Sequence, residues 1–171
     1  MGPQKDDLGV FQLKSEEYGS KYGEDLFEQY KMYVEMADRI SERRATANNF
    51  FLAANTLLIS IFGIVTGKDA LSSGSIGTWF PLFALSGLAF STTWFYIVKS
   101  YRQLNSGKFK VIHEVEKHLP LALYKAEWMA LGEGNDPSLY RPLTHVEKYA
   151  PLTFGIIYIV ILVISIHLNK C

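Results

Sequence analysis

A long stripe of apolar positions runs from the polar beginning of the chain into its first hydrophobic run. From Leu26 the stripe repeats at alternating spacings of four and three residues, passes Arg44 and continues to Ile61. A mean period of 3.5 residues is typical of a coiled-coil seam, and no Pro or Gly interrupts the chain between Gly23 and Gly63. We therefore expect one helix, roughly 60 Å long at about 1.5 Å per residue, that begins in water and ends in lipid.

The two halves of this helix differ in the residues that flank the stripe. In the first half the other positions are largely charged, so this half is expected to lie in the cytosol and to meet further copies of itself through the seam. The second half is apolar on every side, which is typical of a membrane span. The predicted seam residues are Leu26, Tyr30, Tyr33, Ala37 and Ile40.

Three apolar runs predict three transmembrane helices and an all-α fold. The runs occupy positions 50–65, 79–98 and 152–166, and about 18 to 20 such residues are enough to cross a bilayer. The β-branched bias of the last run would suit a buried strand in a soluble protein, but its length favours a span. The expected organisation is a mobile arm at 1–22, an oligomerising helix at 23–48, spans at 49–66, 78–98 and 149–168, and a helical segment at 99–148.

Basic residues flank these spans unevenly. They precede the first span, follow the second and precede the third, whereas the loop at 67–77 and the tail after Ile166 hold few of them. Because positive residues accumulate on the cytoplasmic side, the amino terminus and the segment 99–148 are expected in the cytoplasm. The short loop and the carboxyl terminus are expected on the other side.

The segments outside the spans carry weaker signals. Pro120 separates two amphipathic helical stripes, and Thr144 with Glu147 has the spacing of a capping box that would start the last helix. The arm shows no clear period and is expected to be mobile. Its apolar residues offer the alternative of docking on the helices; they are Val10, Phe11, Leu13 and Tyr18.

Catalytic motifs are scarce. His113 and His118 are five positions apart, which separates them by about 140° on a helix, so they cannot share a metal as an i,i+4 pair does. We expect a solvated helix face at 113–118. The lone cysteine, Cys171, excludes a cysteine metal cluster. Without a visible site we expect no enzymatic activity, no metal and no cofactor.

Polar and small residues also occur inside the apolar runs. Asn49, Ala53, Thr56, Ser60 and Gly63 share one face of the first span, and such groups in lipid prefer a helix partner or water. Helix packing and pore lining both remain open interpretations. In the second span a strip of Ala84, Gly87 and Ser91 predicts a packing groove. The predicted pore or gate residues are Asn48, Asn55, Thr56, Leu58, Ile61 and Phe62.

Arg44 occupies a seam position at the expected cytoplasmic mouth of the first span. In a symmetric oligomer it would point toward the axis, where guanidinium groups must find an anion, a carboxylate or water. It is interpreted either as part of an anion site, such as one for a nucleotide phosphate, or as an anchor near lipid headgroups. The predicted ligand-binding residues are Arg39, Arg43 and Arg44, with Lys108 and Lys110 as secondary choices.

The segment YKMYVEMADRISERR at 30–44, followed by ANNFFL at 47–52 and by Asn55-Thr56, resembles small bacterial membrane effectors of nucleotidyltransferase-linked anti-phage defence. These are the SLATT-type proteins and the membrane component of the Hailong system. The resemblance implies an inner-membrane homo-oligomer, with a tetramer favoured, that acts as an ion channel and depolarises the membrane to abort infection. It also implies gating by a nucleotide or a short single-stranded DNA from the partner enzyme. The alternative is a non-conducting adaptor that recruits a cytosolic partner through its coil.

Overall fold

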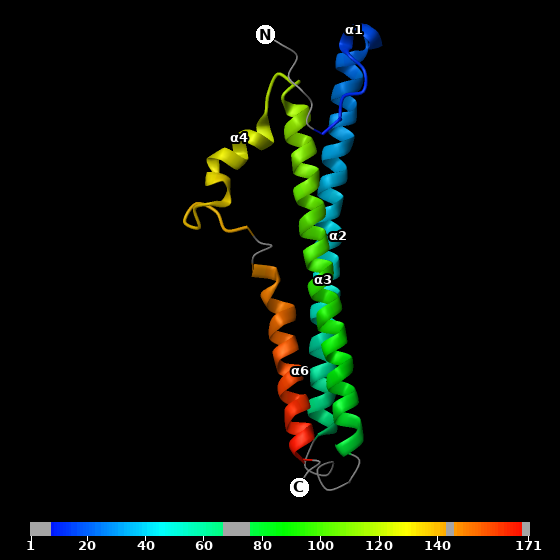
Figure 1. The fold of residues 1–171 in the computed structure, drawn as a ribbon, viewed down its shortest axis with the longest axis vertical. Coiled ribbons are helices and arrows are strands. Elements are labelled where there is room, and N and C mark those ends of the chain that lie inside the picture. Colours follow the sequence, from blue (N-terminus) through cyan, green and yellow to red (C-terminus); the bar gives the residue numbers. More distant parts are fainter. Residues whose placement is uncertain (1–7, 67–75, 143–145, 169–171) are drawn as a thin grey trace. The chain divides into compact units, whose positions relative to one another are not determined.

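The computed structural model describes residues 8–66, 76–142 and 146–168, and helices dominate all three ranges (Figure 1). Three of the helices are long and apolar enough to cross a membrane, which confirms the predicted all-α fold. The helices are α1 (Ser15–Tyr18), α2 (Tyr22–Val65), α3 (Ile76–Glu116), α4 (Leu123–Ala130), the 3-10 turn η2 (Gly132–Gly134) and α6 (Tyr149–Leu168).

Helix α2 continues from a polar segment into an apolar one, and α3 continues from an apolar segment into a polar one. The 44 residues of α2 include the whole predicted seam and the first span. The 41 residues of α3 join the second span to the segment at 99–148, where the sequence analysis placed a boundary. The change in polarity does not interrupt the helix, because its backbone hydrogen bonds are internal in water and in lipid alike.

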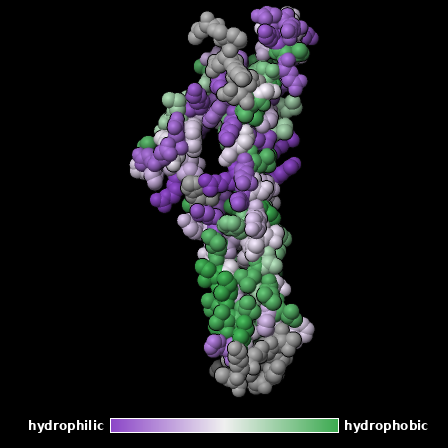
Figure 2. Space-filling view, viewed as in Figure 1, coloured by the Kyte–Doolittle hydropathy of each residue, from purple (hydrophilic) through white to green (hydrophobic). Residues whose placement is uncertain are grey.

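The chain divides into two compact units, and α2 and α3 contribute to both. Figure 2 shows a largely hydrophilic surface on the first unit and a largely hydrophobic surface on the spans of the second. The first unit comprises Met1–Arg43 and Arg102–Pro142, and the second comprises Arg44–Tyr101 and Leu143–Cys171.

The core of the second unit joins all three spans. Trp94 of α3 stacks on Phe51 of α2, with ring centroids 5.9 Å apart, and its ring lies 6.0 Å from that of Phe154 of α6. Further along α3, a Cβ at Gly87 would overlap the ring of Tyr158 of α6. This close approach confirms the packing groove predicted along Ala84, Gly87 and Ser91, all of which are buried.

In the first unit the described part of the arm docks on the long helices. The ring of Phe11 lies 4.1 Å from that of His118, between centroids, and Tyr18 donates a hydrogen bond from its hydroxyl to Asp25 Oδ2 at 2.7 Å. The structure thus shows the docking alternative for Phe11 and Tyr18, whereas Leu13 stays 52% exposed. Positions 1–7 of the arm, where mobility was also predicted, lie outside the described residues.

Candidate functional site

The predicted oligomer seam faces helix α3 within the first unit. Tyr30 donates a hydrogen bond from its hydroxyl to Glu116 Oε1 at 3.1 Å, and Lys108 Nζ lies 4.4 Å from the centre of the Tyr33 ring. A stripe with a 3.5-residue period does not distinguish a partner helix in the same chain from one in another copy, so the role between copies stays a prediction. All five residues are buried or half-buried: Leu26, Tyr30, Tyr33, Ala37 and Ile40.

Glu116, at the end of α3, connects three helices of the first unit. Only 1% of this residue is exposed. Besides the Tyr30 hydroxyl, its carboxylate accepts the backbone N–H of Tyr124 at 2.8 Å and of Lys125 at 3.0 Å, in the first turn of α4. A negative charge is favourable at such a helix start. Burial, followed by the hydrogen bond to Glu116, raises the pKa of Tyr30 to about 12.

The prediction of a solvated helix face at 113–118 is therefore wrong for Glu114 and Glu116. Glu114 is 7% exposed and Glu116 is 1% exposed, and Glu114 forms an ion pair with Lys117. Acidic residues are rarely buried unless they are paired, and the partners of Glu116 come from elements that the sequence does not place beside it. No group of three metal-ligating side chains occurs among the described residues.

The basic residues predicted to bind an anion differ in their surroundings. In the first unit Arg39, Arg43 and Lys110 are exposed, and Arg39 forms an ion pair with Glu35 of the same helix at 2.7 Å. Lys108 is only 7% exposed and its ammonium group lies over an aromatic ring. Three of these cations therefore face solvent, whereas Lys108 takes part in packing.

Arg44 belongs to the second unit and faces a carboxylate there. Its Nε lies 3.7 Å from Glu147 Oε1, and the two side chains are only 15% and 13% exposed. The 3.7 Å between Arg44 Nε and Glu147 Oε1 is too long for a direct hydrogen bond. Neither Arg44 Nε nor Glu147 Oε2 has a hydrogen-bond partner among the described residues. The sequence analysis considered an anion, a carboxylate or water as the partner of this guanidinium, and the structure supplies the carboxylate.

Thr144 of the predicted capping box lies outside the described residues.

Asn55 is the centre of a buried polar cluster in the second unit. Its Nδ2 donates to the Phe51 carbonyl oxygen at 2.8 Å. Its Oδ1 accepts hydrogen bonds from the hydroxyls of Tyr158 at 3.1 Å and Ser91 at 3.4 Å. The cluster joins α2, α3 and α6 and leaves Asn55 with 0% exposure. Hydrogen bonds of this kind stabilise helix contacts in lipid, so the amide is used inside the protomer.

The other predicted pore or gate residues fall on different faces of α2. Asn48 Oδ1 accepts a hydrogen bond from the indole N–H of Trp94 at 2.9 Å, and Phe62 stacks on Phe83 with centroids 4.7 Å apart. Leu58 is half-buried. The structure therefore does not gather the six residues on one surface. The two that are exposed are Thr56 and Ile61.

A stripe of polar and small residues on α2 remains exposed in the second unit. The hydroxyls of Thr56 and Ser60 donate to the backbone carbonyl four residues earlier, each at 2.8 Å. A Cβ at Gly63 would meet nothing within 4 Å. No described part of the chain covers this face, which we call the α2 polar stripe. It consists of Asn49, Ala53, Thr56, Ser60 and Gly63.

Comparisons with known proteins identify a family for the chain. A model of the octameric membrane protein family (8xMP) matches residues 27–167, a range that begins in α2 and ends in α6. Searches of curated proteins and of solved structures returned no match. The family's name supports an oligomer, with eight copies where the resemblance favoured four, and it does not identify a SLATT-type or Hailong protein. Because the match covers most of its length, the chain belongs to the octameric membrane protein family.

Proposed function

We propose that eight copies of this chain form an ion channel whose conducting path runs along the first span of each copy. The exposed α2 polar stripe is the observation that carries this proposal. Polar groups on a membrane helix are costly against hydrocarbon and require another helix or water. Repeated around a central axis, the stripe would supply the hydroxyl and amide groups that line many aqueous pores.

The structure changes which residues we assign to this path. Asn48 and Asn55 make their hydrogen bonds within the protomer, so we remove them from the lining and keep Thr56. Phe62 packs on Phe83 and Leu58 is half-buried, so we remove both from the lining. Ile61 is 47% exposed and directly follows Ser60, about 100° around the helix from it, where an apolar side chain beside the lining suits a gate that closes by dewetting. The proposed lining is Asn49, Thr56 and Ser60, with Ile61 as the gate.

The number of copies and the orientation belong to the same proposal. The family name supports an octamer, and a closed ring of eight requires a head-to-tail contact repeated around the axis. The resemblance to bacterial effectors implies the inner membrane, and the distribution of basic residues supports an orientation with the amino terminus and the segment 99–148 in the cytoplasm. We assign no catalytic step to the chain.

The resemblance to defence effectors extends the proposal to a physiological role. A nucleotide or short single-stranded DNA from a nucleotidyltransferase partner would control the channel, and loss of control would depolarise the cell during phage infection. Arg39, Arg43 and Lys110 are exposed and suited to an anion. The exposed pair of Arg39 with Glu35 is weak enough to exchange for such a ligand. Arg44 and Lys108 are proposed to act structurally instead.

The test is ion flux through purified protein in liposomes, combined with a voltage-sensitive dye in bacteria that express the chain alone. A channel gives flux in liposomes and depolarises cells when it is open by default. The double change Thr56→Leu and Ser60→Leu should reduce the flux at least about tenfold, because it removes the proposed polar lining. Leu57→Ala, at an exposed apolar position of the same helix, is the matched control. Octameric protein without any flux would refute the proposal.

A second function rests on a specific feature of the same stripe. Because the hydroxyls of Thr56 and Ser60 are bonded to their own helix, the stripe is also compatible with dry packing in a non-conducting adaptor that recruits a cytosolic partner. Ala53→Cys, in a chain that also carries Cys171→Ser, distinguishes the channel from the adaptor. A polar thiol reagent modifies this cysteine rapidly in a water-filled pore and slowly in a dry interface.

A further inference from the structure

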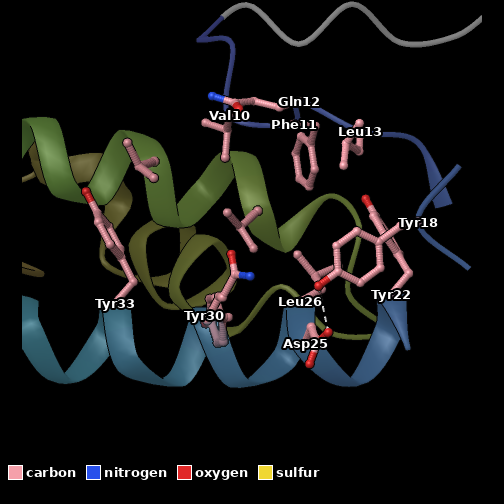
Figure 3. Close-up of a pocket in the computed structure, with 13 residues that line it drawn as sticks. Val10, Phe11, Gln12, Leu13, Tyr18, Tyr22, Asp25, Leu26, Tyr30 and Tyr33 are labelled. Carbon is pink, nitrogen blue, oxygen red and sulfur yellow. Dashed lines mark hydrogen bonds between the residues drawn. The ribbon is translucent and has the colours of Figure 1, made fainter. Parts of the chain in front are cut away.

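The first unit contains a cavity of about 520 Å³ between the docked arm and the two long helices. Figure 3 shows Val10, Phe11 and Leu13 on one side and the aromatic side chains of α2 on the other. Val111 and Val115 of α3 complete the apolar part of the wall. The cavity lies wholly within the first unit and is separate from the α2 polar stripe.

Tyrosine side chains and one carboxylate give this cavity its chemical character. Tyr18 and Tyr22 approach edge to face with centroids 5.9 Å apart, and the Tyr18 hydroxyl is held by Asp25. Tyr30 and Tyr33 line the same wall, although Tyr33 already has an ammonium group over its ring. Among the described lining residues Asp25 is the only charged one.

A wall of this composition is suited to a positive charge. The faces of tyrosine rings carry negative electrostatic potential and attract ammonium groups, and the carboxylate supplies a counter-charge. In the surrounding stretch 14–25 acidic residues outnumber basic ones, since Glu16, Glu17, Glu24 and Asp25 stand against Lys14 and Lys21. A phosphate would instead meet Asp25 without any basic partner among the described lining residues.

We infer that this cavity binds a small organic cation, with Asp25 as its counter-ion and the rings of Tyr18, Tyr22 and Tyr30 around its ammonium group. The ligand class is a quaternary or alkylated ammonium ion, which gains from several aromatic faces at once, and 520 Å³ leaves room for substituents larger than those of choline. This site is independent of the channel proposal, and its ligand has the opposite charge to the nucleotide signal.

The experiment is calorimetric titration of choline into the full-length protein in phosphatidylglycerol nanodiscs. We expect one choline per chain. Asp25→Asn, which removes the charge and keeps the shape, should weaken binding about five-fold or more. Glu24→Gln is the matched control, because Glu24 is the exposed neighbouring acid and does not line the cavity. It should leave the affinity within about two-fold.

The aromatic contribution is tested at Tyr22. Tyr22→Phe keeps the ring and should bind choline nearly as well as the unchanged protein, whereas Tyr22→Leu should bind about three-fold more weakly. Circular dichroism and the elution volume of each variant establish that it is folded. Phosphatidylglycerol carries no choline, so the lipid of the nanodisc cannot compete with the added cation.

Three results would overturn the inference. The first is no binding of choline in phosphatidylglycerol nanodiscs. The second is equal affinity in Asp25→Asn and in the unchanged protein, since the carboxylate would then make no contribution. The third is binding of inorganic phosphate that is lost when residues of the cavity wall are changed, because an anion site there contradicts the charge of the lining. None of these outcomes depends on whether the octamer conducts ions.

Discussion

The central buried polar groups of the two units differ in their chemistry. In the first unit a carboxylate, Glu116, is buried and its oxygens are bonded to backbone N–H groups and a hydroxyl. In the second unit the central buried group is the neutral amide of Asn55, and further polar residues stay exposed on α2. Exposed polar residues are ordinary in water and costly in lipid. The α2 polar stripe therefore carries more functional information than the exposed charges of the first unit.

The largest expected effect tests the buried carboxylate. Glu116→Ala leaves two backbone N–H groups of α4 and the Tyr30 hydroxyl without their acceptor, which should destabilise the first unit by about 3 kcal/mol. Hydrogen exchange should show lost protection at Tyr124 and Lys125, with the second unit unchanged. Glu127→Ala, which changes an exposed residue of α4, is the control. Unaltered exchange at these two amides would show that Glu116 does not hold α4.

A somewhat smaller effect is expected from overfilling the second unit. Gly87→Leu places a side chain where the ring of Tyr158 lies and should cost about 2 kcal/mol of unfolding free energy, measured by denaturation in detergent micelles. Gly155→Leu is the control, because a Cβ there meets nothing within 4 Å. Adding Tyr158→Ala should recover part of the loss at Gly87. Equal stability of the two leucine variants would contradict this packing.

A direct comparison of inward and outward polar residues uses two neighbours on α2. Asn55→Leu removes the acceptor of Tyr158 and Ser91 and should cost about 1 kcal/mol. Thr56→Val removes a hydroxyl bonded only to its own helix and should change the unfolding free energy by no more than about 0.5 kcal/mol. Ion flux in liposomes should instead be reduced more by Thr56→Val than by Asn55→Leu, since Thr56 is the proposed lining residue. Equal effects of both variants on stability and on flux would show that the inward and outward residues do not differ in role.

The smallest effect concerns alkaline pH in the first unit. Because the folded pKa of Tyr30 is raised from 10.0 to about 12, its contribution to stability is complete below pH 10.0. It decreases as the pH rises toward about 12, since the unfolded chain loses this proton first. Hydrogen exchange of α4 over this range should show the decrease in the unchanged protein and a weaker one in Tyr30→Phe. An identical pH dependence would assign the effect to other groups, such as Tyr124, whose pKa burial also raises.

The positions of the helices were largely predictable, but the pairing of their faces was not. Hydrophobic length located the spans, and the predicted last span at 149–168 coincides with α6. The seam from Leu26 to Ile40 was recognisable as a contact surface, yet its period did not say that α3 of the same chain lies against it. Asn55 and Thr56 are adjacent and similarly polar, so the sequence alone offered no reason to place one inside and the other outside.

For the basic residues too, the sequence predicted the need for a partner but not which residue the partner would be. Arg44 was expected to need a partner, because a guanidinium at a seam position cannot stay unpaired. The identity of that partner, Glu147, required the residues just before α6 to be placed beside α2 in the second unit. Lys108 looked like any other cation of its segment, and only its position over the ring of Tyr33 distinguishes it from the exposed Lys110.

The sequence by itself determined that this protein is helical, that it has three spans, and that α2 links a charged segment to an apolar one. These properties depend on local hydrogen bonding and on the length of apolar runs, which neighbouring residues set. Only the tertiary structure decided that Glu116 is buried, that Asn55 is used internally, and that the α2 polar stripe is left uncovered. Burial depends on which distant helices meet, and that information is not contained in any one segment.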